Sequence, residues 1–335
     1  MKESEIRPKN LHDTIIDLSR QDVERLILSK KDELEEIVCP ACGSKNLTFQ
    51  FKKFGLDYVL CDDCRSLFLS PRPTESFLNK IYPEMESVKY WETHFYKETA
   101  EPRREKMYNP RAKKVVELAD KYSVLDKDLL IDVGAGYGVF LEEIKKVSNF
   151  KELVAIEPVS SLAEVCKSRG IKVIEKNAQD ATSEDIPEKA AVLTCFEVLE
   201  HLINPLTFLN SLSKLLKKEG LFILSAPCIS GIDVQILWEK SKTIYPPHHI
   251  NLLSIEGMES LAKRTNDLEI VEISTPGKLD VDIIRNAKKE GLVDNLGRFF
   301  DYFFWRENEE AFSGLQQFCQ KYNLSSHLMV VMKKK

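Results

Sequence analysis

The sequence predicts an α/β fold built on a doubly wound, mainly parallel sheet. Three observations support this: a glycine-rich loop directly after a short apolar strand, a second apolar strand that ends in a glutamate, and a long alternation of strands and helices. In open sheets of this kind, ligands bind where the strands end. The loop after the first strand is therefore the feature to examine first.

The first sheet strand is predicted over 129–133 and runs into a loop of alternating glycines. The stretch reads LLIDVGAGYG and places glycine at positions Gly134, Gly136 and Gly138. Bare backbone allows a sharp turn and a close approach to a ligand. The helix predicted over 138–147 directs its N-terminal amides toward the same place. The pattern indicates a nucleotide-type pocket, and the alternative is a glycine turn without a ligand.

The spacing of this loop indicates which nucleotide binds. A dinucleotide fingerprint has its third glycine five residues after the first, whereas here it comes four after. Asp132 stands just ahead of the loop and would repel a pyrophosphate, but it suits a ligand with positive charge. S-adenosylmethionine carries a sulfonium and an ammonium group and no phosphate. Glu157 closes the second strand, where its carboxylate can take both hydroxyls of a ribose.

At these residues the chain resembles the class I S-adenosylmethionine-dependent methyltransferases, whose first motif has the form D-x-G-x-G-x-G. The resemblance runs from about residue 39 to the carboxyl terminus. It implies a Rossmann-like sheet of seven strands with the last strand antiparallel, and it implies that Pro158 joins Glu157 at the cofactor. The strands are expected near 129–133, 152–157, 171–175, 190–195, 220–225, 268–275 and 327–333. The helices among them are expected near 138–147, 160–169, 204–218 and 254–265.

The resemblance also assigns residues to the adenine and methionine parts of the cofactor. Asn177 and Ala178 end the third strand, where such enzymes grip the adenine, although many relatives have Asp in place of Asn177. Cys195 and Phe196 end the fourth strand, in the run CFEVLEHLINP, and would lie near the methionine portion. The alternative for the Asn177 segment is a surface turn. For Glu200 and His201, a structural role and a catalytic role are equally plausible.

Four of the eight cysteines have the spacing of a metal site. Cys39-x-x-Cys42 and Cys61-x-x-Cys64 are separated by eighteen residues, which is the two-knuckle spacing of a four-thiolate zinc site. The alternating segment between the pairs predicts a ribbon hairpin. Two disulfides or a redox pair are the alternatives, and a reducing cytoplasm disfavours both.

The segment IYPPHHINLLS contains the densest group of titratable residues. His248 and His249 follow a Tyr-Pro-Pro turn, and histidine can accept a proton near neutral pH. The segment resembles the substrate loop of bacterial deoxysugar C-methyltransferases, which also carry a four-cysteine zinc domain. Aligned on Ser254, their Glu-His pair falls on His248 and His249, and their tyrosine matches Tyr245 only with one inserted residue. A similar loop occurs in zinc-ribbon methyltransferases of surface-polysaccharide pathways. A purely structural histidine pair is the alternative.

The predicted domain organisation places three smaller parts before the methyltransferase domain. The expected parts are a helical segment (1–37), a zinc ribbon (38–72), a linker with helical cover (73–125) and the methyltransferase domain (126–335). An insertion at about 280–325 holds two helical patterns and an aromatic cluster. Core or oligomer packing is favoured for this cluster over a substrate lid, and a homodimer is one possibility.

Composition narrows the function. The 335 residues are 43% hydrophobic and 30% charged, as in ordinary soluble proteins. No apolar run approaches the roughly 20 residues that span a bilayer, and the amino terminus lacks an apolar signal core, so a cytoplasmic protein without membrane contact is expected. The net charge of −5 weighs against a nucleic-acid partner.

The main hypothesis is methyl transfer to a small molecule, most plausibly a sugar or nucleotide sugar, with the choice of oxygen, nitrogen or carbon open. This chain has His248 where the deoxysugar C-methyltransferases have a glutamate. Without that carboxylate, a histidine base acting on oxygen or nitrogen is as plausible as carbon deprotonation. Methylation of RNA or protein, with the ribbon as docking module, is the alternative. A non-catalytic cofactor-binding scaffold is a third reading.

Overall fold

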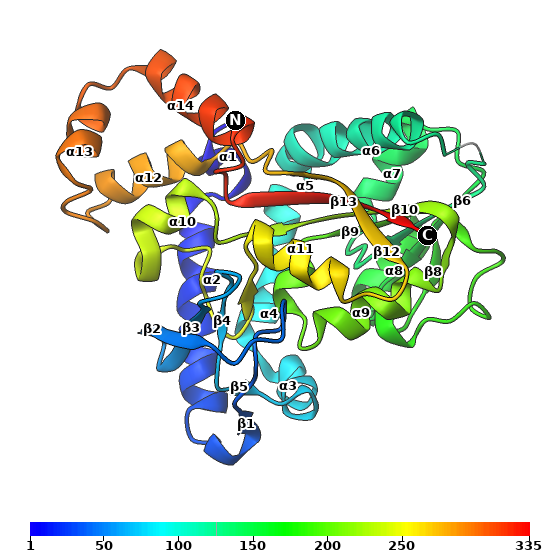
Figure 1. Cartoon of the computed structure of the whole chain (residues 1–335), viewed down its shortest axis with the longest axis horizontal. Coiled ribbons are helices and arrows are strands. Elements are labelled where there is room, and N and C mark those ends of the chain that lie inside the picture. Colours follow the sequence, from blue (N-terminus) through cyan, green and yellow to red (C-terminus); the bar gives the residue numbers. More distant parts are fainter. Residues whose placement is uncertain (125) are drawn as a thin grey trace. The chain divides into compact units, whose positions relative to one another are not determined.

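The computed structural model describes residues 1–124 and 126–335 and divides into two compact units (Figure 1). The unit with the clustered cysteines, called the cysteine unit below, comprises Met1–Thr99, Pro227–Met258 and Ser274–Leu328. The other, called the sheet unit, comprises Ala100–Ala226, Glu259–Ile273 and Met329–Lys335. Each unit therefore combines three stretches of chain. The predicted domain limits stay a prediction, and the limit at residue 125 falls outside the described residues.

The sheet unit is built on seven strands in the order β12-β13-β10-β9-β6-β7-β8. The five strands from β10 to β8 in this order run parallel to their neighbours, and the closing strand β13 is antiparallel. This confirms the predicted Rossmann-like sheet. The strands are β6 (Leu129–Val133), β7 (Glu152–Ile156), β8 (Lys172–Ile174), β9 (Ala190–Phe196), β10 (Leu216–Pro227), β12 (Leu268–Ser274) and β13 (His327–Lys334).

Strand β6 occupies the point where the strand order reverses. It pairs with β7 on one side and β9 on the other, so that Asp132 lies opposite both Ala155 and Thr194. All five residues of β6 are buried. Because crossovers leave in opposite directions from this strand, its carboxyl end opens into the crevice where such sheets bind ligands.

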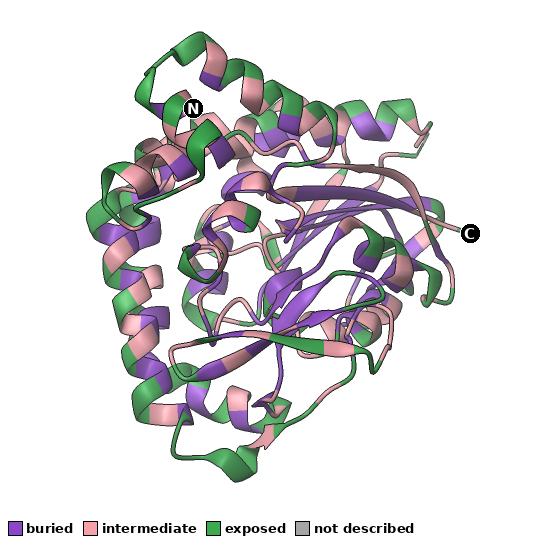
Figure 2. Ribbon diagram, turned by 60° about the vertical axis from the view of Figure 1, so that its left-hand side comes forward, coloured by how far each residue is buried: buried purple, intermediate pink, exposed green. Residues whose placement is uncertain are grey.

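Helices cover the sheet and complete its core. Leu118 of α6 and Phe140 and Leu141 of α7 pack with Leu130 of β6 in one cluster of buried residues. Each such burial contributes roughly 1.5–3 kcal/mol relative to exposure. Figure 2 shows the strands largely buried and the outer faces of the helices exposed. The helices are α6 (Asn109–Lys121), α7 (Val139–Val147), α8 (Ser160–Ser168) and α9 (Pro205–Ser213), and α11 (Ile255–Lys263) begins in the cysteine unit and ends in the sheet unit.

Strand β10 begins earlier than the sequence predicts. The predicted helix over 204–218 ends at Ser213, and Leu216 already pairs with Ala190 of β9. The register then shifts before Leu221, which is the signature of a bulge. A Cβ on Gly220 would lie 2.9 Å from the Lys217 carbonyl oxygen, so only glycine fits this bulge. The spacing of apolar residues across the bulge also fits a helix, so the sequence predicts a helix there.

The cysteine unit contains a four-stranded antiparallel sheet in the order β11-β4-β3-β2. The β2–β3 hairpin turns at Phe54 and Gly55, which both have positive φ, as tight hairpin turns require. Strand β11 comes from a distant part of the chain and pairs with β4. The strands are β2 (Leu47–Lys53), β3 (Leu56–Cys61), β4 (Leu67–Leu69) and β11 (Asn251–Leu252), and a separate pair joins β1 (Leu34–Glu35) to β5 (Arg72–Pro73).

The amino-terminal helix is shorter than the predicted helical segment. Helix α2 continues through π-helical turns to Ile27, and the chain is already extended at Leu34, where it pairs with Pro73. Among the described residues, no helix has both the length and the apolar character that a bilayer crossing demands. The helices of this part are α1 (Glu3–Ile6), α2 (Lys9–Asp22), α3 (Glu75–Ile81), α4 (Glu86–Tyr90) and α5 (Tyr96–Arg103), the last of which runs into the sheet unit.

The insertion near the carboxyl terminus forms three helices where two helical patterns are predicted. The breaks lie at Gly291 and Gly297, both with positive φ, and at Asn308, whose side chain accepts a hydrogen bond from the Ala311 amide. Phe304 is buried against the neighbouring helices, whereas Trp305 is exposed. The helices of the insertion are α12 (Asp280–Lys289), α13 (Arg298–Trp305) and α14 (Glu309–Lys321), and the earlier helix α10 (Ile232–Leu237) belongs to the same unit.

Candidate active site and metal centre

The glycine loop lies between β6 and α7, at the reversal point of the sheet. Gly134, Gly136 and Gly138 all have positive φ, between 55° and 72°. A Cβ on Gly134 would lie 2.7 Å from Val198 Cγ2, and one on Gly138 would lie 2.6 Å from Ile171 Cδ1. A Cβ on Gly136 would have no neighbour within 4 Å. The outer glycines therefore serve packing, and the middle one presents open backbone.

Glu157 holds this loop in place. One of its carboxylate oxygens accepts a hydrogen bond from the Gly136 amide at 2.8 Å, and the other accepts one from the Val159 amide at 3.0 Å. The side chain is only 4% exposed. Pro158 lies between these contacts, in the turn from β7 to α8. Glu157, which the sequence predicts to bind the ribose hydroxyls, is thus also the residue that shapes the loop.

Asp132 is a buried carboxyl group behind the loop. Thr194 Oγ1, on the paired strand, donates a hydrogen bond to it at 2.7 Å. Burial raises the pKa of Asp132 to about 7, and the hydrogen bond from Thr194 and the charge of Arg111 oppose this rise. The group therefore titrates near neutrality, and a bound cation would favour its carboxylate form.

The remaining predicted cofactor residues lie at the carboxyl ends of β8 and β9. Asn177 is exposed and donates a hydrogen bond to Asp180 at 3.2 Å, and Ala178 begins the following turn. Cys195 is buried, and burial raises the pKa of its thiol. Phe196 packs edge-on against Phe140 with ring centroids 5.0 Å apart. The structure thus brings the predicted cofactor residues to one edge of the sheet.

Two charged residues at this edge are missing from the sequence-based prediction. Arg111 of α6 is buried, with its guanidinium 4.4 Å from the Phe196 ring centre and 3.2 Å from a carboxylate oxygen of Glu197. Ser225 donates a hydrogen bond to the same Glu197 oxygen at 2.7 Å. Glu197 has positive φ. Its place inside the CFEVLEH motif could have marked it as a site residue, but nothing local marks Arg111. Glu200 is buried beside the more exposed His201, 3.8 Å away.

The four predicted metal ligands meet in the cysteine unit. The Sγ atoms of Cys39 and Cys64 are 3.5 Å apart, as are those of Cys42 and Cys61, and no disulfide joins any of them. All four sulfur atoms lie within 4.8 Å of one another. Tetrahedral Zn²⁺ with bonds of about 2.3 Å would separate its sulfur ligands by about 3.8 Å. The geometry and the donor atoms therefore fit a zinc ion.

The two cysteine pairs have the same backbone geometry. In each knuckle, the amide after the second cysteine donates to the carbonyl of the first: Gly43 to Cys39 at 2.9 Å and Arg65 to Cys61 at 2.8 Å. Gly43 and Arg65 both have positive φ. These turns direct both thiols of a pair to one point, which is the arrangement a shared metal ion requires.

The Tyr245–His249 loop is attached to the cysteine sheet. The Tyr58 hydroxyl, on β3, donates to the His249 carbonyl at 2.7 Å, and the Leu69 amide, on β4, donates to the Ile250 carbonyl at 2.9 Å. The Tyr245 ring lies 4.2 Å from the His249 ring and 5.6 Å from the His248 ring, measured between centroids. The three residues predicted to be catalytic are therefore gathered on one braced loop.

The tautomer of His249 follows from its partner. Its Nδ1 lies 2.6 Å from the Thr243 carbonyl oxygen, which can only accept a hydrogen bond. Nδ1 must therefore carry the proton, and in the neutral ring Nε2 is the basic nitrogen. The loop thus holds an oriented imidazole whose basic atom is defined.

The sheet order and the acidic, glycine-rich loop at its reversal point define a class I S-adenosylmethionine-dependent methyltransferase. A family model described as a methyltransferase domain matches residues 103–273, which is just over half of the chain. The chain belongs to this methyltransferase family and is an S-adenosylmethionine-dependent enzyme.

Individual relatives match shorter parts. The ubiquinone biosynthesis O-methyltransferase of Haemophilus ducreyi is 30% identical over 105 residues, and that of Actinobacillus pleuropneumoniae is 31% identical over 104 residues. Each alignment covers 29% of this chain, which spans 44% of the length of these curated relatives.

Solved structures with a similar fold include two further methyltransferases. The plantazolicin methyltransferase BpumL, in complex with a triazolic desmethylPZN analog and S-adenosylhomocysteine, has a TM-score of 0.49 and 16% identity, covering 77% of this chain and 95% of that one. An S-adenosylmethionine-dependent methyltransferase from Clostridium acetobutylicum has a TM-score of 0.45 and 11% identity, covering 71% and 98%.

The open backbone at Gly136 leads to a first prediction. We expect Gly136→Ala to weaken S-adenosylmethionine binding, measured by calorimetry, because the new methyl group would occupy ligand space. Gly170→Ala is the matched control: Gly170 has positive φ and no neighbour within 4 Å, but it lies outside the loop. Both variants should lose about 1–2 kcal/mol of stability from backbone strain. Equal cofactor affinity in the two variants would contradict the assignment.

The buried Asp132 leads to a second prediction, on pH. Because a cationic ligand favours the carboxylate and the pKa lies at about 7, S-adenosylmethionine affinity should rise with pH through neutrality. The change is at most about tenfold per pH unit on the acidic side. Titration calorimetry across this range tests it. Asp132→Asn should bind more weakly and lose the pH step; a step of unchanged size in that variant would show that another group titrates.

Proposed function

We propose that this enzyme methylates a hydroxyl group of a small-molecule acceptor, with a sugar or nucleotide sugar as the acceptor class. The observation that carries the proposal is the oriented His249 imidazole, whose neutral tautomer is set by the Thr243 carbonyl. The resemblance of this loop to those of sugar-modifying methyltransferases supports the acceptor class. The names of the two bacterial relatives, both O-methyltransferases, support oxygen as the atom methylated.

The residues at the sheet edge fit the cofactor. The open Gly136 backbone allows close approach, Asp132 supplies negative charge for a cationic ligand, and Glu157 is placed at the end of β7. We infer that these residues, with Asn177 and Phe196, hold S-adenosylmethionine. When bound, the cofactor supplies a methyl group on a positively charged sulfur.

The acceptor hydroxyl must lose its proton as it is methylated. A sugar hydroxyl is a poor nucleophile, so a base within hydrogen-bond reach accelerates its reaction. In the proposal, the hydroxyl proton moves to His249 Nε2, and the positive charge that forms on the ring is stabilised by the Thr243 carbonyl at Nδ1. His248 and Tyr245 support the ring and the acceptor.

We further propose that Cys39, Cys42, Cys61 and Cys64 bind a structural Zn²⁺. The four thiolates would fill all four coordination positions of a tetrahedral ion, so no position would remain for a substrate. The role that the contacts support is to stabilise the sheet on which the Tyr245–His249 loop rests. Ser254, after the loop, donates from Oγ to the Cys64 carbonyl, and its amide donates to Ser66 Oγ at 3.1 Å. The ribbon domain proposed for residues 38–72 thus acts on the acceptor side.

Metal removal tests this role. Purified protein should contain one zinc per chain by mass spectrometry of the metal, and Cys42→Ser should lose it. Cys319→Ser is the matched control, because Cys319 is a buried thiol of the same unit outside the cluster. With the metal removed, acceptor affinity should fall before S-adenosylmethionine affinity does. Full acceptor affinity in metal-free protein would refute the bracing role.

A turnover assay tests the proposed reaction. S-adenosylhomocysteine release is measured with a panel of nucleotide sugars, free sugars, catechols and total RNA. We expect turnover with a sugar-type acceptor, and a loss of about 10²- to 10⁴-fold in kcat for the His248→Ala/His249→Ala double variant, since that is the usual contribution of a general base. Cofactor affinity should stay unchanged. Turnover with RNA alone, or undiminished turnover in the double variant, would overturn the acceptor class or the base, respectively.

A further inference from the structure

His248 is connected to the amino-terminal segment of the chain. Its Nε2 lies 2.8 Å from Ser87 Oγ, at the start of α4, and Ser87 Oγ lies 2.6 Å from a carboxylate oxygen of Asp22, at the end of α2. Ser87 and Asp22 are each only 1% exposed. A chain of three polar groups, of which Asp22 and Ser87 are buried and His248 is half-buried, therefore links helix α2 to the predicted catalytic loop.

Asp22 is held as a carboxylate. Burial alone would raise its pKa, but hydrogen bonds from the Ser87 hydroxyl and amide, the Arg25 guanidinium and the Glu86 amide together lower it. An ionised carboxylate only accepts hydrogen bonds. The Ser87 hydroxyl must therefore donate its single proton to Asp22.

This direction sets the proton on His248. Because the Ser87 hydroxyl proton points to Asp22, Ser87 Oγ acts as acceptor toward His248 Nε2. The neutral His248 ring therefore carries its proton on Nε2, and Nδ1 is the unprotonated nitrogen. His249 shows the opposite arrangement, with its proton on Nδ1. Two adjacent histidines are thus held in opposite tautomers by two different partners.

Helix capping explains only part of this arrangement. Asp22 accepts from the Glu86 and Ser87 amides, which would stabilise the first turn of α4 without any histidine. The Ser87–His248 hydrogen bond adds nothing to that cap. Its effect is to fix the orientation and the tautomer of the ring.

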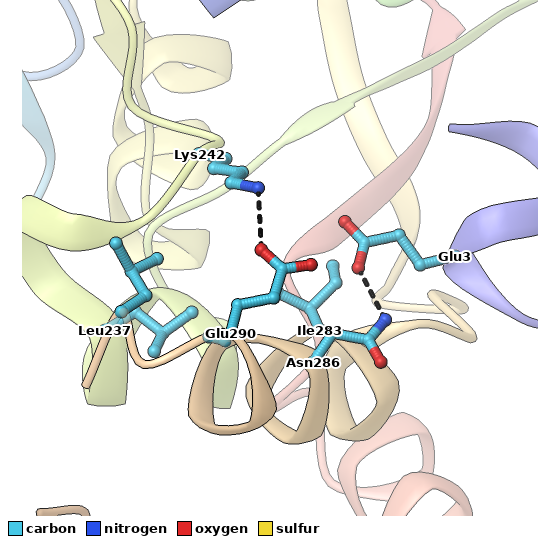
Figure 3. Close-up of a pocket in the computed structure, with 8 residues that line it drawn as sticks. Glu3, Leu237, Lys242, Ile283, Asn286 and Glu290 are labelled. Atoms are coloured by element: carbon cyan, nitrogen blue, oxygen red, sulfur yellow. Dashed lines mark hydrogen bonds and ion pairs between the residues drawn. The ribbon is translucent and has the colours of Figure 1, made fainter. Parts of the chain in front are cut away.

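Helix α2 also anchors the other end of the loop. Lys242, just before Thr243, donates a hydrogen bond to Asp13 of α2 at 2.6 Å. Figure 3 shows the Lys242 ammonium pointing to Glu290, the residue that caps the end of α12. The two groups are 3.3 Å apart, beside a hydrogen bond of 2.9 Å from Asn286 to Glu3. The small cavity between these groups, about 20 Å³, is too small for a substrate. The contacts of Lys242 therefore attach the segment before the loop to α2 and to the end of α12.

We propose that Asp22 and Ser87 are positioning residues that hold His248 in its Nε2-protonated tautomer. The catalytic meaning of this tautomer rests on the proposed function, but the tautomer itself does not. In the enzyme, the Asp22–Ser87 pair keeps His248 Nδ1 unprotonated, so that this atom can accept a hydrogen bond while the acceptor proton moves to His249. It also gives the amino-terminal helix, which lies outside the residues matched by the family model, a role in the active site.

Nitrogen NMR of the full-length protein labelled with ¹⁵N-histidine tests the proposal without any acceptor. The signals of His248 are identified among the six histidines by their loss in His248→Gln. At a pH where the ring is neutral, we expect a protonated-type Nε2 signal and an unprotonated-type Nδ1 signal. In Ser87→Ala, which keeps both amide donors of the cap, the two signals should shift toward averaged values because the ring samples both tautomers.

Two further variants keep the test decisive. Ser19→Ala removes a buried hydroxyl of the same helix, bonded to the Ile15 carbonyl, and should leave the His248 signals unchanged. Asp22→Asn should shift them, since the amide can donate to Ser87. An Nδ1-protonated His248 in the natural protein, or unchanged signals in Ser87→Ala, would overturn the proposal. Intact turnover in the histidine double variant would instead overturn the proposed base and leave this tautomer result standing.

Discussion

The pairing of β11 with β4 is the interaction on which the proposed acceptor-side chemistry depends. It joins two stretches that lie far apart in the sequence, the cysteine ribbon and the segment that follows His249. The Tyr58 and Leu69 hydrogen bonds continue the pairing up to the histidine itself. The Tyr245–His249 loop contains two prolines and leads into this short strand, so the pairing fixes its carboxyl end. The cysteine cluster, the β11–β4 pairing and the histidine pair therefore form one continuous structure within the cysteine unit.

The cofactor edge of the sheet unit follows a different principle. There the backbone does most of the positioning, and a single carboxylate, Glu157, holds the glycine loop through two amides. Because Asp132 is buried next to a hydroxyl and titrates near neutrality, its charge is readily available to a cationic ligand. Rigid backbone and one adjustable charge suit a ligand that must enter as a cation and leave after losing a methyl group.

The sequence was sufficient to predict those features that are encoded locally. The glycine spacing after β6, the knuckle spacing of Cys39 and Cys42, and the alternation of strands and helices each lie within a short window, so they can be read directly. Arg111 could not be predicted to reach Glu197, because that contact depends on how α6 packs on the sheet. The same holds for Asp22 and His248, which are joined only by the fold. The bulge in β10 was hidden because its residues also fit a helix.

If the acceptor binds at the Tyr245–His249 loop as proposed, the way in which the cysteine unit is assembled limits how acceptor preference can change. The unit draws on three separate stretches of chain, and only part of it lies within the residues matched by the methyltransferase family model. Transplanting residues 38–72 alone into a relative would leave β4 without its β11 partner and the histidine loop without its support. New acceptor preferences would therefore arise by coordinated change in all three stretches, whereas the cofactor edge could be inherited almost unaltered.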